Sequence, residues 1–339
     1  MQNESIGRTW FRRIPYRALS LAISVVLLVL GIAVLHQRVN WRDVAAVWLN
    51  LDPILVALAC GIYWLQYPFN SIRLQRVILW TTGRSALEIV SLRFLFKVTC
   101  SSGFVAAAAP IGLAGDAAKI AALRLFGSLS VTEATRCALF DRVVGVQWLC
   151  LIGLATLPFQ GAAGLSAEII LAQLAIFSVP IVGVGVLLAL PSILARIPGH
   201  LIERIARVFA GYQAILLPSR SAIQGAIMLL NVVLAGGALY LLFLAAGSHV
   251  SAWLIAAFIP LLQLVNGLPF LYMGWGGREI AMASTLGAAS SLTMNETLAI
   301  SIAWGVVLIT TGVVNGLFLI GDWHSAVPSV DDDKTGRVT

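Results

Sequence analysis

Apolar runs long enough to cross a membrane recur along this chain of 339 residues. A helix needs about 20 apolar residues to span a hydrocarbon core about 30 Å thick. Hydrophobic residues make up 59% of the chain, charged residues make up 11%, and the mean hydropathy is +0.93. Soluble domains do not have this composition. Because a membrane span must satisfy its own backbone hydrogen bonds, the sequence predicts an all-α polytopic membrane protein.

The apolar runs define the expected domain organisation. We expect about eight hydrophobic segments, over residues 18–35, 53–71, 85–110, 143–158, 168–190, 221–246, 261–287 and 297–320. Residues 18–321 then form a single transmembrane domain. Residues 1–17 are a basic N-terminus, and residues 322–339 are a polar tail that we expect to be disordered.

Basic residues indicate how the segments are oriented. Four arginines precede the first segment, and Arg73, Arg76 and Arg84 follow the second. Loops rich in Lys and Arg stay on the cytoplasmic side. The N-terminus and the 73–84 loop are therefore predicted to be cytoplasmic, and the protein is expected in the plasma membrane, as a multi-pass protein of a bacterial inner membrane. The net charge of +7 is explained by this topology and not by a nucleic-acid partner.

Charged residues inside the apolar sequence mark the candidate site. Asp116, Lys119, Asp141 and Arg142 lie between long hydrophobic runs. A charge at bilayer depth costs about 2.5 kcal/mol or more, so each needs a partner, a ligand or a water-filled cavity. Two structural explanations remain open. Asp116 is suited to capping a helix after Gly115, and the Asp141-Arg142 pair is suited to the cytoplasmic flank of a helix start.

A second copy of this stretch follows at a constant offset. Placing Asp116 on Glu279 (279 − 116 = 163) also places SLSVTEAT, residues 128–135, on SLTMNETL, residues 291–298, without a gap. Glu133 then falls on Glu296, and both are expected to cap helices. The offset indicates two repeats, about 53–158 and 216–321. Since the basic 73–84 loop maps onto an uncharged segment, the repeats are expected to be inverted.

Each repeat is predicted to contain a broken or re-entrant helical hairpin. Proline and glycine interrupt helices, and a broken helix at membrane depth is tolerated where it packs in protein or faces a cavity. Arg278 and Glu279 follow the second bend. Neighbouring residues on a helix do not face one another, so we expect these two to have different partners, with Glu279 near Asp116 or Arg142. The predicted bend residues are Pro110, Gly112, Gly115, Gly274, Gly276 and Gly277.

At these hairpins the sequence resembles the flippase-like transmembrane family related to the N-terminal region of lysylphosphatidylglycerol synthases. The family patterns P-x-G, G-D-x-x-R and D-R compare with Pro110-Ile111-Gly112, with residues 115–119, and with Asp141-Arg142. Its pattern G-G-x-G-x-R-E compares with residues 273–279. Two positions depart from the family: Lys119 stands in place of Arg, and Met273 in place of Gly.

The resemblance implies lipid translocation. A flippase would move a polar, anionic lipid, such as a polyprenyl-phosphate-linked sugar or a glycerophospholipid, between leaflets through a charged groove at the repeat interface. The residues expected to bind and move it are Asp116, Lys119, Asp141, Arg142, Arg278 and Glu279. Asp116 and Glu279 would hold the cations when the head is absent.

Other functions stay open. The chain could be a non-transporting membrane subunit beside a lipid- or glycan-synthesising enzyme, or a lipid-dependent glycosyltransferase. Short catalytic motifs are not found in the sequence, so we expect no enzyme activity. The four cysteines lack metal-ligand spacing and the four histidines are scattered, so we expect no metal or cofactor.

Overall fold

The computed structural model describes residues 40–83, 91–109, 113–194, 212–268, 271–290 and 292–320. Within these ranges the regular secondary structure is entirely helical, which confirms the all-α fold. The predicted N-terminus over 1–17, the first segment over 18–35, the tail over 322–339, and the bend residues Pro110 and Gly112 lie outside the described residues.

The helices fall into two series, one for each predicted repeat. The first comprises α2 (Trp41–Leu49), α3 (Pro53–Trp64), α4 (Gln66–Thr82), α6 (Leu92–Ala108), α7 (Ala114–Phe126), α8 (Val131–Ala162) and α9 (Ala167–Leu194). The second comprises α11 (Pro218–Ala245), α12 (Ala252–Asn266), α13 (Gly277–Met282), the π-helix η1 (Ala283–Gly287), α14 (Met294–Val314) and the 3₁₀ helix η2 (Asn315–Leu319).

Several helices are long and apolar enough to cross a membrane. Four pass this test among the described residues: α8, the 167–186 part of α9, α11, and α14 with η2. Helices α2 and α3–α4 pass it together but are bent by 86° at their junction, giving up to five spans. The structure thus supports a multi-pass membrane protein.

Helix starts are set by local side-chain chemistry. Ser130 accepts from the Glu133 backbone N–H, while the Glu133 carboxylate accepts from the Ser130 backbone N–H, which makes a capping box at the start of α8. Thr293 and Glu296 form the same box at the start of α14. The predicted capping role of Glu133 and Glu296 is therefore confirmed.

Helix boundaries repeat at the offset found in the sequence. The starts of α7 and α13 differ by 163 residues (277 − 114), as do the starts of α8 and α14 (294 − 131). The ends of α4 and α11 differ by the same number (245 − 82). The two predicted repeats therefore have the same order: α3–α4 or α11, then a hairpin of two shorter helices, then α8 or α14. Helices α2 and α9 lie outside the predicted repeats.

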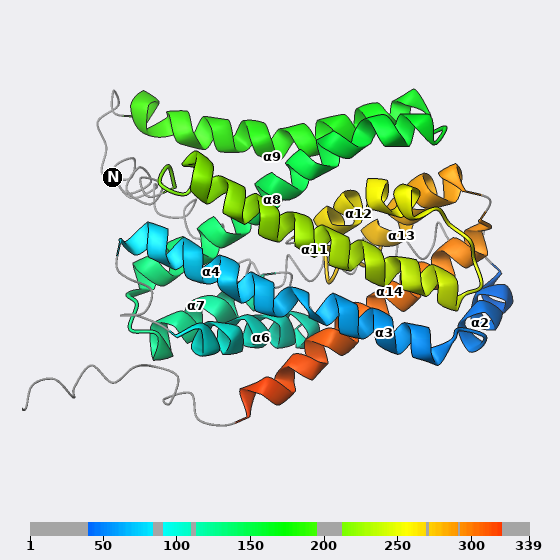
Figure 1. The fold of residues 1–339 in the computed structure, drawn as a ribbon, viewed down its shortest axis with the longest axis horizontal. Coiled ribbons are helices and arrows are strands. Elements are labelled where there is room, and N and C mark those ends of the chain that lie inside the picture. The colour runs from blue at the N-terminus through cyan, green and yellow to red at the C-terminus, as the bar shows by residue number, and fades with distance from the viewer. Residues whose placement is uncertain are drawn as a thin grey trace, which may run out of the picture.

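The corresponding long helices run in opposite directions. Figure 1 shows α3 and α4 lying along the long axis beside α11, with the chain running one way in the first pair and the other way in α11. The backbone N–H of Asp52, at the start of α3, donates to the carbonyl of Ala245, at the end of α11, over 3.0 Å. This antiparallel arrangement is the one expected for inverted repeats.

The shorter helices pack as hairpins. Helix α6 packs against α7, and α12 packs against α13 and η1. In Figure 1 the α6–α7 hairpin lies toward one end of the long axis and α12–α13 toward the other. Small residues permit the contact in the first hairpin: a Cβ added at Gly115 would lie 2.7 Å from the Ser102 carbonyl oxygen. The predicted broken hairpins are therefore present in both series.

Candidate functional site

A linked group of charged side chains lies where the first hairpin meets α4 and α8. Asp116 and Lys119 are three residues apart and share one face of α7, while Asp141 and Arg142 are consecutive on α8. Arg73 joins them from α4. We call these five residues the charged cluster.

Asp141 bridges two cations inside the protein. Its Oδ2 accepts from Lys119 Nζ over 2.8 Å and its Oδ1 accepts from Arg73 Nε over 2.9 Å. The Asp141 side chain is 3% exposed, and those of Lys119 and Arg73 are 11% and 12% exposed. Gly145 makes room for this packing, because a Cβ there would lie 2.7 Å from Arg73 Nη1.

Arg142 bridges the two hairpins. Its Nη1 forms an ion pair with Asp116 at the start of α7, and its Nη2 donates over 2.5 Å to the carbonyl of Gly267, the C-cap of α12. The side chains of Arg142 and Asp116 are 28% and 24% exposed. This pair is therefore partly open, unlike the neighbouring Asp141 carboxylate.

A second contact joins the two hairpins. Tyr272, between α12 and α13, donates its hydroxyl to the carbonyl of Ala107 near the end of α6, over 2.5 Å. Gly312 of α14 also packs against Ala107. The end of α6 thus contacts the segment between α12 and α13, and Arg142 contacts both hairpins nearby.

The charged cluster carries an excess of positive charge. Arg73 and Lys119 share Asp141, whereas Arg142 pairs with Asp116, so the five side chains together carry one excess positive charge, which lies beside Asp141. An uncompensated charge away from water is unfavourable. The arrangement therefore favours a ligand with one negative charge, such as a phosphodiester, which Arg and Lys bind through charge-assisted hydrogen bonds.

The second hairpin carries a different ion pair, formed by Arg278 and Glu279. Arg278 Nη2 donates to Glu279 Oε1 over 2.7 Å, and Glu279 Oε2 accepts from the Gly276 backbone N–H over 2.6 Å. Ser301 Oγ donates to Glu279 Oε1 over 3.0 Å. The side chains of Arg278 and Glu279 are 0% and 5% exposed, and the guanidinium lies over the Trp275 ring at 4.7 Å.

The prediction that Arg278 and Glu279 have different partners is wrong. These residues pair with each other, and the described contacts do not join Glu279 to Asp116 or Arg142. Consecutive residues inside a helix point in different directions. Arg278 and Glu279, however, both lie in the first turn of α13. There Glu279 turns back to cap the helix, which brings its carboxylate within reach of the neighbouring guanidinium.

The capping explanation for Asp116 is wrong, and the flank explanation for Asp141-Arg142 is wrong about the helix start. Asp116 lies inside the first turn of α7, whose N-cap is Leu113 without a side-chain cap. Helix α8 begins at Val131, twelve residues before the expected span over 143–158, and continues through that span. Asp141 and Arg142 therefore lie inside a long helix and not at its start, and their position at the cytoplasmic flank of the membrane stays a prediction.

Arg73 is the cluster member that sequence reasoning missed. We assigned Arg73 to a cytoplasmic loop, but α4 continues to Thr82 and holds Arg73 against Asp141. The available signal was helical spacing, since Gln66, Asn70 and Arg73 occupy one face. A polar stripe of this kind faces a bundle interior in an apolar helix.

Arginine and glycine exchange places between the repeats. The offset of 163 places Gly305 on Arg142 (305 − 142) and Arg278 on Gly115 (278 − 115). The missing side chain of Gly305 leaves room for the Arg278 guanidinium, because a Cβ at Gly305 would lie 2.7 Å from Arg278 Nη2. Each acid of the repeat therefore meets one arginine, supplied by α8 in the first repeat and by the hairpin in the second.

The second bend requires left-handed backbone conformations. Gly274 and Gly276 have φ angles of +79° and +84°, which glycine adopts without steric cost. Met273 also has a positive φ of +48°. This is the position where the related pattern has glycine, so the departure in sequence coincides with a strained backbone position.

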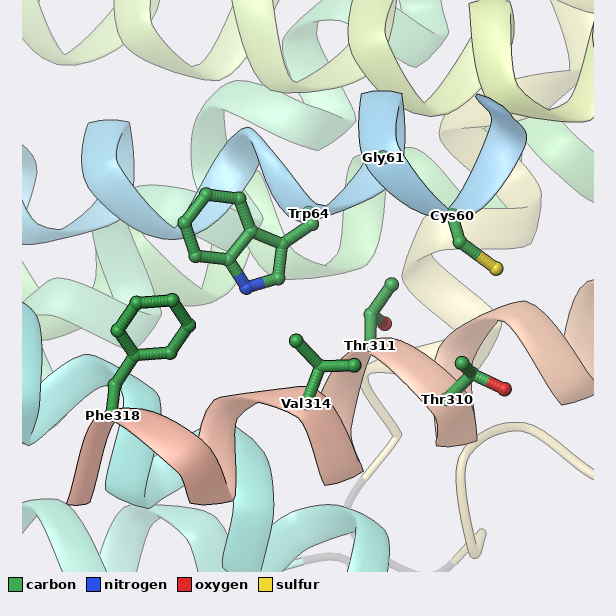
Figure 2. Close-up of a pocket in the computed structure, with 7 residues that line it drawn as sticks. All are labelled: Cys60, Gly61, Trp64, Thr310, Thr311, Val314 and Phe318. Carbon is green, nitrogen blue, oxygen red and sulfur yellow. The ribbon is translucent and has the colours of Figure 1, made fainter. Parts of the chain in front are cut away.

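An apolar pocket of about 320 Å³ lies between α3 and α14. Figure 2 shows Cys60, Gly61 and Trp64 on one side and residues of α14 and η2, among them Thr311 and Phe318, on the other. Thr311 precedes Gly312, which packs against the first hairpin. The pocket therefore lies beside the hairpin junction, and its lining suits a hydrocarbon chain.

A second apolar pocket lies between helices of both repeats. It has a volume of about 360 Å³ and lies between α8, α11 and α12, with Thr156, Tyr240 and Ile259 in its wall. Each of the two pockets is therefore lined by helices of both repeats.

The described residues contain no group of three or more His, Cys, Asp or Glu side chains placed to hold a metal ion.

A comparison with curated proteins finds no match. A family model described as the lysylphosphatidylglycerol synthase TM region matches residues 17–316. This match covers most of the chain, including both hairpins, α8 and α14. The protein therefore belongs to the family of the lysylphosphatidylglycerol synthase TM region.

Proposed function

We propose that this protein is a lipid flippase, which moves a polar, anionic lipid between leaflets. The observation that carries the proposal is the charged cluster, with one excess positive charge, at the junction of two oppositely oriented hairpins. Secondary transporters place their sites at the interface of inverted repeats, near broken helices. The substrate classes that fit are glycerophospholipids and polyprenyl-phosphate-linked sugars.

In this proposal the phosphate competes for Arg142. The Arg142–Asp116 pair is about a quarter exposed, so a phosphate oxygen can approach the guanidinium without unfolding the protein. Asp116 neutralises Arg142 when the head is absent and releases it when phosphate binds. Lys119 and Arg73 stay on Asp141 and supply the positive field. Arg278 and Glu279, which we expected in the site, support the second hairpin.

Movement of the two hairpins would expose the cluster to each leaflet in turn. Arg142 contacts both hairpins, so a head that takes over its hydrogen bonds also loosens the junction. The lipid tails remain in hydrocarbon or in the apolar pockets beside α3 and α11. Such a mechanism needs no catalytic residue, and we propose no enzyme activity. The proposed location is the bacterial inner membrane, with a cytoplasmic N-terminus.

The test is transbilayer movement in liposomes that contain the purified protein. Labelled glycerophospholipids and short polyprenyl-phosphate sugars are compared in wild-type protein, Arg142→Ala and Arg220→Ala. Arg220 is a matched control, because it is a helix α11 cation that contacts Trp80 and the Ala214 carbonyl outside the charged cluster. We expect faster movement of one lipid class, lost in Arg142→Ala and kept in Arg220→Ala. No acceleration of any lipid by folded wild-type protein would reject the flippase and favour a non-transporting subunit.

A further inference from the structure

A stripe of amide side chains crosses the interior beside the charged cluster. Gln66 and Asn70 lie on the same face of α4 as Arg73. Asn70 Oδ1 accepts from Asn231 Nδ2 of α11 over 2.8 Å, and Gln66 Oε1 accepts from Gln263 Nε2 of α12 over 3.5 Å. Amides from different helices are thus brought together within an otherwise apolar bundle.

This stripe meets the charged cluster at both ends. At one end, Asn70 is followed one turn later by Arg73, which pairs with Asp141. At the other end, Asn266 lies one turn after Gln263 on α12 and directly precedes Gly267, the carbonyl acceptor of Arg142. Because Asp141 and Arg142 are consecutive, both ends of the stripe lead to the same part of α8. The uncharged members of the stripe, which we call the amide arc, are Gln66, Asn70, Asn231, Gln263 and Asn266.

Several amide-arc groups are buried without a hydrogen-bond partner in the described part of the chain. They are Gln66 Nε2, Asn231 Oδ1, and both side-chain polar atoms of Asn266. Gln66 is 7% exposed and Asn231 is 2% exposed. Leaving one buried amide group unpaired costs about 1–3 kcal/mol. Their grouping in one part of the bundle favours a ligand that satisfies them.

The chemistry of the unpaired groups specifies the ligand. The set includes donors, Gln66 Nε2 and Asn266 Nδ2, and acceptors, Asn231 Oδ1 and Asn266 Oδ1. A hydroxyl both donates and accepts hydrogen bonds and is uncharged. A phosphate would satisfy only the donors, and it is better matched by the cations of the charged cluster.

We propose that the amide arc is a binding subsite for hydroxyl groups of the lipid head, adjacent to the phosphate site of the charged cluster. This inference rests on the proposed lipid substrate and narrows it. The preferred lipid is an anionic phosphodiester whose head carries hydroxyls, as glycerol, inositol or a sugar does. A phosphodiester lipid without head hydroxyls binds only through its phosphate.

The test compares two lipids that share the same charge. Short-chain phosphatidylglycerol and phosphatidylmethanol both carry one phosphodiester, and only the first has head hydroxyls. Dissociation constants are measured on the full chain in detergent, by native mass spectrometry or by thermal stabilisation. We expect wild-type protein to prefer phosphatidylglycerol about three- to tenfold, the affinity equivalent of one net hydrogen bond.

The variants locate the preference. In Gln66→Met, which keeps the length of the side chain and removes its amide, we expect affinity for phosphatidylglycerol to fall to that for phosphatidylmethanol. Gln173→Met is the matched control, because Gln173 is 2% exposed, has two unpartnered amide atoms and lies on α9 away from the arc. It should keep the preference. Asn231→Leu provides a second arc variant if Gln66→Met does not fold.

The outcomes separate this inference from the proposed function. Equal wild-type affinities, binding of neither lipid, or a preference that survives in both arc variants would overturn the subsite. A preference that the arc variants abolish supports it, whether or not the protein moves lipid in liposomes. If lipids move without any such preference, the flippase stands and the amide arc is not its head subsite.

Discussion

The two hairpins carry equivalent acids in unlike surroundings. Asp116 pairs with Arg142 in a site whose side chains are about a quarter exposed, whereas Glu279 pairs with Arg278 in a site that is nearly closed. The open pair spans two hairpins and adjoins an excess positive charge. The closed pair is neutral, caps its own helix and is covered by Trp275.

This difference suggests different roles for equivalent positions of the two predicted repeats, and we propose one role for each pair. In the first repeat the acid and the arginine lie on different helices, α7 and α8. In the second repeat Arg278 and Glu279 are consecutive and lie in the same turn of α13. We therefore propose that the closed pair holds the second hairpin in shape and that the open pair exchanges its partner for a ligand. Stability should depend on the closed pair and lipid handling on the open one.

The largest effect on stability should follow from Glu279→Gln. The change leaves the fully buried Arg278 guanidinium without its counter-charge, which costs about 3–5 kcal/mol in the free energy of unfolding. The measurement is the thermal unfolding midpoint in detergent. Adding Arg278→Met to this variant should recover most of the loss, since a neutral side chain needs no counter-charge. A midpoint equal to that of wild type would contradict a structural role for the pair.

A smaller loss should follow from filling the space beside each arginine. In Gly305→Ala the new methyl group meets Arg278 Nη2 and Trp275 at less than 3 Å, and in Gly145→Ala it meets Arg73 Nη1. Overpacking of this kind costs about 1–3 kcal/mol. We expect Gly305→Ala to cost more, because Arg278 is enclosed, whereas Arg73 is 12% exposed.

The control for both substitutions is Gly183→Ala on α9, where an added Cβ meets no atom within 4 Å. Alanine is favoured over glycine in a helix by about 0.5–1 kcal/mol, so this variant should match or exceed the wild-type midpoint. If Gly305→Ala behaves as Gly183→Ala does, the close approach of Arg278 to α14 is not a constraint.

The smallest effect should come from the second bend. Met273→Gly and Met273→Ala both remove the same packing of Met273 on the main apolar core, but only glycine relieves the positive φ. The glycine variant should therefore be more stable than the alanine variant by about 1 kcal/mol. Comparing their unfolding midpoints isolates the backbone effect, and the reverse order would show that Met273 is not strained.

Much of the fold could be predicted because short sequence patterns specify it, and these patterns occur in both repeats. The apolar runs, the capping residues before α8 and α14, and the glycine-rich bends are each readable over a few residues. Together with the offset of 163 they predict the helix order and the opposite orientations. Helix starts do not follow from hydropathy alone, because α8 begins at Val131 with a polar, capped first turn that precedes its apolar part.

The charged site could be predicted only in part. Asp116, Lys119, Asp141 and Arg142 stand out against apolar sequence, and all four lie in the charged cluster. Arg73 was hidden because it precedes other basic residues and matches a cytoplasmic flank. The pairing of Arg278 with Glu279 depends on side chains turning back at a helix start, which residue spacing does not describe.

The central claim is that the open pair handles lipid and the closed pair holds the fold. Its most direct test is the rate of transbilayer movement per folded protein in liposomes, measured for Asp116→Asn and Glu279→Gln beside wild type. The substrate is the lipid class that the wild-type protein accelerates. Unfolding midpoints are recorded on the same preparations.

We predict that Asp116→Asn slows lipid movement about tenfold or more, because without the carboxylate that competes for Arg142 the bound phosphate is released slowly, while its midpoint stays near that of wild type. Glu279→Gln should lower the midpoint, and the molecules that remain folded should keep most of the wild-type rate. If Asp116→Asn moved lipid at the wild-type rate, or if only Glu279→Gln stopped movement in folded protein, the assignment of the two pairs would be wrong.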